Sequence, residues 1–224
     1  MQTQDTPTEF LIKFWPWFEA NRKRLTGFAV AVVVILLAGY FYTTEQAQKA
    51  VEAGRAYTQL QLNQPPNPTV QQVADEFQQL ANKYPGTLAG QRAQAQAASV
   101  LFSAGRYADA QALFQKIAAA NASGPLAAAA QLGVAACLES QNQPDAAATA
   151  YRAVMTGFPN SAEAVPAKFS LGRVLEAQGK LTEAAGYYTE VAHSPLAGSL
   201  AQEAAQRLAQ IKAAAAATKP AAKP

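Results

Sequence analysis

The sequence GKLTEAAGYYTEV, at residues 179–191, repeats the pattern of NQPDAAATAYRAV, at residues 142–154, after a step of 37 residues. Two more copies continue the register toward the N-terminus: GRYADAQALFQKI at residues 105–117 and the more divergent PTVQQVADEFQQL at residues 68–80. Each copy has a turn-forming residue first, then a small residue, an aromatic ring and an aliphatic residue at fixed positions. A period of this length predicts a stacked array of helix pairs, because one pair has too little apolar surface to form a core alone.

The repeated residues predict how paired helices meet. Ala110, Ala147 and Ala184 occupy one position of the register and are small enough to let two helices approach closely. The aromatic ring follows one helical turn later, as Tyr151 does after Ala147, and fills the wider gap toward the next unit. We therefore interpret these residues as core and assign them no binding role.

Proline and glycine divide the rest of the chain into helices. Thr69 with Gln72 resembles a capping box at the start of one of them. Gly105, Asn142 and Gly179 tolerate the positive φ that a tight reversal between helices often needs. The expected helices span residues 69–83, 87–103, 106–119, 125–140, 144–157, 161–177, 181–193 and 197–215, which predicts an all-α fold.

An uncharged run of 18 residues, LTGFAVAVVVILLAGYFY at residues 25–42, predicts a transmembrane helix. As a helix it is about 27 Å long, close to the hydrocarbon thickness of a bilayer. The basic residues Arg22, Lys23 and Arg24 precede it, so the positive-inside rule places the N-terminus in the cytoplasm and the rest of the chain across the membrane. Aromatic residues expected at the two membrane interfaces include Trp15, Trp17, Tyr40 and Tyr42.

Three alternatives to a retained anchor fit this run less well. A cleaved signal peptide would need small residues at a cleavage site, and Ala38-Gly39-Tyr40 matches poorly. A lipoprotein would need a cysteine where Tyr40 stands. A buried core helix is inconsistent with an apolar surface on all sides, flanked by aromatic and basic residues.

The expected organisation has four parts. Residues 1–24 form a cytoplasmic segment whose part 8–24 is a short interfacial helix, with partner binding as its alternative role. The transmembrane helix covers residues 25–43, the repeat domain 44–215 and a flexible Ala/Lys/Pro tail 216–224. No helix breaker separates the span from residues 44–62, so one long helix is expected to leave the bilayer and begin the array.

Composition excludes several classes of function. The net charge is only +3 and charges of both signs are interspersed, so there is no basic stripe for nucleic acid. The single Cys137 cannot form an internal disulfide, and an alanine-rich helix is a typical setting for a small buried thiol. The single His193 precedes Ser194-Pro195 at an expected helix end and has no clustered metal ligands. We therefore predict no enzyme, cofactor, metal or catalytic residue.

The repeats resemble tetratricopeptide repeats. The resemblance is carried by Asn142, Ala147, Tyr151 and Pro159, and again by Leu171-Gly172 with the residues that follow in the last copy. The usual unit is about 34 residues, so the step of 37 implies slightly longer helices or loops. The unit at 44–85 departs from the pattern. The resemblance implies an α-solenoid that binds proteins.

The whole layout resembles the ancillary subunit of the bacterial Sec translocon, a membrane-anchored family described as a chaperone-associated adaptor for exported proteins. The carriers are FLIKFWPWFEANRKR, the span and the long helix after it. This resemblance implies an inner-membrane protein with a periplasmic repeat domain, whose partners are translocon subunits, periplasmic chaperones or exported clients. The later units also resemble the tetratricopeptide region of the Tol-Pal coordinator of envelope constriction. Alternative roles are therefore an envelope or division coordinator, or a self-associating structural protein that forms homo-oligomers.

Arrays of this family usually hold ligands on the surface lined by the first helix of each unit. The three good units predict a mixed groove that suits extended or helical apolar segments better than acidic tails. The alternative is that its charges form only a solvated face. The predicted groove residues are Arg92, Ser99, Phe102, Leu132, Ala136, Glu139, Phe169, Arg173 and Glu176.

Overall fold

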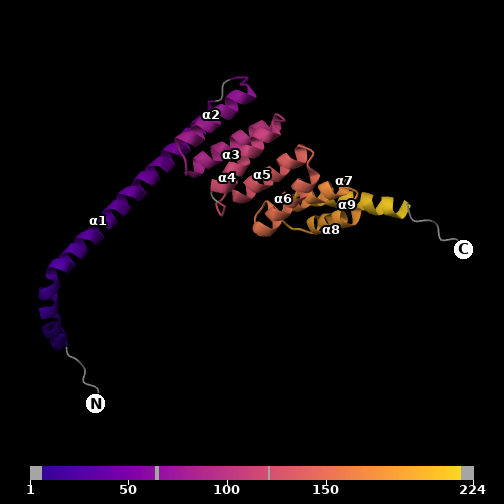
Figure 1. Cartoon of the computed structure of the whole chain (residues 1–224). Coiled ribbons are helices and arrows are strands. Elements are labelled where there is room, and N and C mark those ends of the chain that lie inside the picture. Colours follow the sequence, from indigo (N-terminus) through magenta and orange to yellow (C-terminus); the bar gives the residue numbers. More distant parts are fainter. Residues whose placement is uncertain (1–6, 64–65, 121, 218–224) are drawn as a thin grey trace, which may run out of the picture. The chain divides into compact units, whose positions relative to one another are not determined.

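The computed structural model describes residues 7–63, 66–120 and 122–217, and its regular elements there are nine α-helices (Figure 1). Their bounds are α1 (Pro7–Leu62), α2 (Val70–Lys83), α3 (Leu88–Ser103), α4 (Tyr107–Ala120), α5 (Ala127–Ser140), α6 (Pro144–Gly157), α7 (Ala164–Ala177), α8 (Leu181–Ala192) and α9 (Ser199–Ala217). The all-α prediction is confirmed, and the bounds of α2 to α9 lie within about three residues of those expected.

The chain divides after Glu52 into an N-terminal helical unit and a C-terminal unit of packed helices. In the N-terminal unit the side chains of the apolar run are exposed, as Ile35 (68%) and Tyr40 (64%) illustrate. Large apolar side chains are normally covered by protein or by lipid. Within the described residues, α1 is the one helix long and apolar enough to cross a membrane.

The first helix differs from expectation in one respect. The short interfacial helix expected at residues 8–24 is not a separate element, because α1 continues through this segment to Leu62. Pro16 lies inside the helix, where it removes one backbone hydrogen bond but does not end it. After Pro16 no proline occurs before Pro65, so the expected long helix into the array agrees with the bounds of α1.

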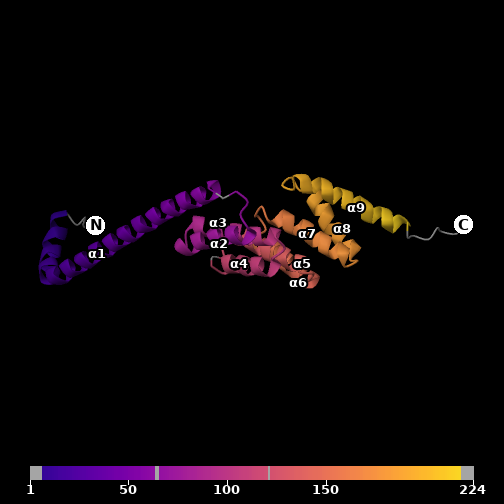
Figure 2. The ribbon, with the colours of Figure 1, turned by 90° about the horizontal axis from the view of Figure 1, so that it is seen from above.

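The C-terminal unit is a succession of helices in which each packs on the next, from α2 through α9 (Figure 2). The first pair is made by the last turns of α1 and by α2, where the rings of Tyr57 and Phe77 lie 6.0 Å apart. At the other end, Ala204 and Ile211 of α9 complete the core.

The register positions form this core as predicted. The three alanines, Ala110, Ala147 and Ala184, are 0% exposed, and the aromatic and aliphatic positions that follow them are buried in all four copies. The divergent first copy differs locally: Val73 is half-buried, and its neighbour Ala74 takes the fully buried place. Close helix approach at the alanines is thus the common packing rule of the array.

The turns within the three good units are also alike. Gly105, Asn142 and Gly179 have φ of 78°, 58° and 75°. In each turn the next residue's N–H reaches back five positions, as Lys180 does to the carbonyl of Leu175 at 2.9 Å, which satisfies a carbonyl at the helix end. The predicted capping box is present, since Thr69 Oγ1 accepts from Gln72 N and Gln72 Oε1 accepts from Thr69 N.

Ala147→Leu tests the packing rule. The added side chain has no space at a position that is 0% exposed, so overpacking should lower the free energy of unfolding by about 1–3 kcal/mol. Denaturant unfolding of the full chain in detergent measures the loss. Ala146→Leu, at the exposed neighbouring position, is the matched control. Equal stability of the two variants would contradict the assigned register.

Candidate partner-binding groove

An open pocket of about 560 Å³ lies between α3, α5 and the start of α7, with α4 closing its base. We call it the groove pocket and define it by Ala95, Ser99, Phe114, Leu132, Ala136 and Glu163. Apart from Ser99 and Glu163, the residues that line it are apolar or glycine. Its volume lies within the roughly 300–1,000 Å³ usual for ligand pockets.

Close backbone approach shapes the base of this pocket. Gly133 faces the ring of Phe114, and a Cβ added at Gly133 would lie 2.8 Å from that ring. The absence of a side chain there lets α4 and α5 pack tightly, and Phe114 also lies on the pocket lining. Glycine at position 133 is therefore needed for the packing of this pocket.

The structure brings some of the predicted groove residues together. Ser99, Leu132 and Ala136 line the groove pocket. Phe102 is half-buried and packs edge-on against Tyr107, with ring centroids 5.2 Å apart. Arg92 is exposed but does not line the pocket, because the position one repeat before Leu132 is Ala95 rather than Arg92.

Phe169 corrects the sequence prediction. The sequence predicts it as a residue of the groove surface, but its side chain is buried and only 5% exposed. Its ring packs against that of Tyr188, with centroids 5.7 Å apart, and the guanidinium of Arg207 lies 5.9 Å from the Phe169 centroid. The last helix thus covers Phe169, whereas Leu132, at the same position one repeat earlier, lies open on the pocket lining.

Of the four charged residues predicted in the groove, Glu139, Arg173 and Glu176 take part in two similar bridges. In the first bridge, Glu139 accepts a hydrogen bond from the Tyr151 hydroxyl at 2.6 Å and an ion-pair contact from Arg173. The residues come from α5, α6 and α7, so this bridge joins one helix pair to the next. The negative carboxylate, the hydroxyl and the guanidinium satisfy one another at a partly buried site.

The second bridge repeats the first one unit later. Glu176 accepts from the Tyr188 hydroxyl at 2.6 Å and from Arg207 at 3.1 Å. The Glu and Tyr positions repeat the step of 37 residues, whereas the arginine comes three residues early. A weaker neighbouring contact joins Arg207 to Glu203 at 3.3 Å.

The same register has no bridge in the preceding unit. The positions equivalent to Glu139, Tyr151 and Arg173 are Phe102, Phe114 and Ala136. Two of these apolar replacements, Phe114 and Ala136, line the groove pocket. The pocket therefore occupies the place in the array where a polar bridge is replaced by apolar side chains.

Burial, together with the bridges, raises the pKa of both tyrosine hydroxyls. Burial raises the pKa of Tyr151, and the hydrogen bond to Glu139 raises it further. Burial and the hydrogen bond to Glu176 raise the pKa of Tyr188 in the same order. Each hydroxyl is consequently a hydrogen-bond donor throughout the neutral range, which is what a carboxylate acceptor requires.

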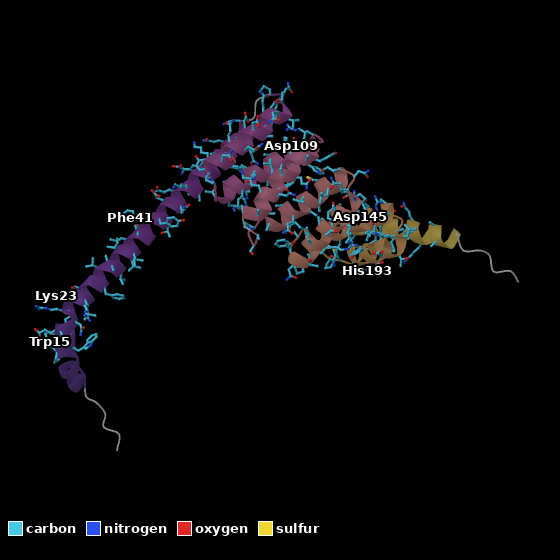
Figure 3. All side chains as sticks on the ribbon, viewed as in Figure 1. Trp15, Lys23, Phe41, Asp109, Asp145 and His193 are labelled. Carbon is cyan, nitrogen blue, oxygen red and sulfur yellow. The ribbon has the colours of Figure 1, made fainter. Side chains whose placement is uncertain are left out.

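The residues that could carry chemistry lie apart. Cys137 is fully buried in α5, and burial raises the pKa of its thiol to about 11, which disfavours the nucleophilic thiolate. His193 is exposed at the end of α8, where its Nδ1 lies 2.8 Å from the carbonyl of Thr189. The carboxylate of Asp109, on α4, pairs with Arg106 and lies well apart from His193 (Figure 3). No metal-binding cluster of His, Cys, Asp and Glu occurs among the described residues.

These features define a repeat protein of paired helices with an open groove. The chain belongs to the tetratricopeptide repeat-like domain family, whose sequence profile matches residues 16–153, more than half of the chain. A tetratricopeptide repeat profile also matches residues 158–201. The first match begins within the aromatic segment and includes the apolar run, so the family profile covers most of α1 and the array as far as α6.

The solved structures that resemble this chain have low sequence identity to it. The type III secretion translocator chaperone SycD of Yersinia enterocolitica is 21% identical, with a TM-score of 0.47 over 55% of this chain and 91% of that one. The kinesin light chain TPR-like repeats of Podosopora anserina are 19% identical, with a TM-score of 0.47 over 79% of this chain and 98% of that one. None of the curated proteins compared with the chain matches it.

Tyr151→Phe should test the first bridge. The change removes the hydroxyl that donates to Glu139 and leaves the ring in place, so unfolding should become easier by about 1–2 kcal/mol. Thermal unfolding followed by circular dichroism measures the effect. Tyr187→Phe is the control, because the Tyr187 hydroxyl makes no hydrogen bond within the described residues. A loss no greater than that of the control would show that the bridge contributes nothing to the stacking.

Proposed function

We propose that this chain is a membrane-anchored protein-binding scaffold, which acts as a periplasmic adaptor at the bacterial inner membrane. Its family is built from repeats that form protein-interaction surfaces. The observation that carries the proposal is an open, apolar groove pocket in a chain whose first helix is long and apolar enough to cross a membrane. The scaffold would hold a segment of a partner in the groove and perform no chemistry on it.

The proposed orientation places the N-terminus in the cytoplasm and the repeat domain in the periplasm. It is supported by the basic residues Arg22, Lys23 and Arg24 before the apolar run. The first charged residue after the run, Glu45, is acidic. An anchor of this kind confines the groove to the membrane surface. Confinement raises its effective concentration near membrane complexes, so modest affinity for each partner is sufficient.

We place this adaptor beside the Sec translocon. The support is the resemblance in layout: an aromatic and basic segment, a single span and a long helix leading into the array. The partners would then be translocon subunits, periplasmic chaperones or exported clients. The likeness of the later repeats to a Tol-Pal coordinator makes an envelope or division role the main competing assignment.

Photo-crosslinking in living cells tests this function. A photoreactive amino acid at Ser99, on the groove pocket, should capture translocon subunits, periplasmic chaperones or exported proteins, identified by mass spectrometry. The same amino acid at Lys116, exposed on α4 and outside the pocket lining, should capture far less. Capture of division or envelope-assembly proteins alone would overturn the Sec assignment. Capture of the chain alone would instead indicate self-association.

A further inference from the structure

The groove pocket has an unusual origin within a regular array. In the two later units, a Glu, a Tyr and an Arg satisfy one another and join adjacent helix pairs. In the pocket unit, Phe102, Phe114 and Ala136 hold those positions and cannot form such a bridge. Alanine in place of arginine also leaves the volume of the long side chain unfilled. The result is an open apolar hollow at one step of the stack.

An apolar hollow of this kind gains stability when an apolar side chain enters it. Ala95, Leu132 and Ala136 present aliphatic surface, and Phe114 contributes part of its ring. Burying a large apolar side chain contributes on the order of 1.5–3 kcal/mol. The volume of about 560 Å³ admits a bulky side chain and leaves space for its neighbours along the groove.

Among the described residues, one charged group lines this pocket. Glu163, at the start of α7, is half-buried and lies on the pocket lining. Within the described residues its carboxylate forms no ion pair or side-chain hydrogen bond, in contrast to Glu139 and Glu176. A partly buried carboxylate without a cation is complementary to a positively charged ligand group.

We propose that the groove pocket binds an apolar-basic segment of a protein partner: a bulky apolar side chain fills the hollow, and a neighbouring Lys or Arg pairs with Glu163. This inference rests on the proposed scaffold function and specifies the chemistry of its partner. Acidic and polar segments should bind the groove pocket more weakly. An acidic segment would place like charge against Glu163, and a polar segment would leave the hollow unfilled.

Two other occupants match the pocket less well. The chain's own tail, residues 216–224, supplies Lys219 and Lys223 but only alanine, threonine and proline beside them, so it has no bulky apolar group. A lipid tail would fill the hollow without using the carboxylate. The apolar-basic segment is the ligand that satisfies both features.

Peptide binding to the full chain in nanodiscs tests the proposal. The probes are three fluorescein-labelled peptides: apolar-basic GSWLKLFSG, apolar-acidic GSWLELFSG and polar-basic GSSSKSSSG. We expect the first to bind about threefold or more tighter than the second, because of Glu163, and about tenfold or more tighter than the third. Fluorescence anisotropy measures the dissociation constants. Equal binding of all three, or no binding, would overturn the proposal.

Matched variants locate the site. Ala136→Leu fills the hollow and should weaken binding of the apolar-basic peptide about tenfold, whereas Ala146→Leu, exposed on α6, should leave it unchanged. Glu163→Lys should reverse the preference between the first two peptides without changing the melting temperature. Unchanged affinities in both pocket variants would contradict the assignment. A chain without residues 216–224 that binds the apolar-basic peptide about tenfold more tightly would also contradict it, because that result would place the tail in the pocket.

These results can be separated from those for the scaffold itself. If the photoreactive amino acid at position 99 captures partners in cells but Ala136→Leu and Glu163→Lys leave the peptide affinities unchanged, the scaffold function stands and the pocket chemistry is wrong. If the pocket variants change the peptide affinities as expected but the photoreactive amino acid at position 99 captures only the chain itself, the pocket chemistry stands and the adaptor role fails.

Discussion

The close approach of helices at the buried alanines is the constraint on which the array depends. Ala110, Ala147 and Ala184 are fully buried, and each lets its helix pack so closely that the ring one turn later fills the remaining gap. Because each helix packs mainly on the next one along the chain, the buried side chains of the described residues form three clusters instead of one central core. Stability must therefore be distributed over many similar interfaces, and each interface can be modified locally with limited effect on the others.

That freedom explains how one step of the stack can differ from its neighbours. Where Glu139, Tyr151 and Arg173 meet, adjacent pairs are joined by a charged hydrogen-bonded bridge, and a second bridge follows at Glu176. One unit earlier the same positions carry apolar residues and an open pocket. The groove thus has a polar, internally satisfied part and an apolar, unsatisfied part. The unsatisfied part has surface to offer to a partner.

Much of the fold could be predicted from the sequence because its determinants are local. Proline and glycine gave the helix bounds, Gly105 and Gly179 gave the turns, and the 37-residue register gave the buried positions. The candidate site was harder to predict. Phe169 is buried because α9 covers its ring. This contact was hard to predict, since α9 repeats the register only approximately. Glu163, whose carboxylate has no ion-pair partner among the described residues, was missed because the pairing of charges is decided in three dimensions.

The most direct test is to build the missing bridge. The triple variant Phe102→Glu, Phe114→Tyr and Ala136→Arg gives the pocket unit the residues of the first bridge. The measurement is the dissociation constant of GSWLKLFSG for this variant in nanodiscs, with its melting temperature as a check on folding. We expect a loss of affinity of about tenfold or more in a chain that is still folded. Unchanged affinity in the folded variant would contradict the claim that the groove binds partners where the bridge is absent.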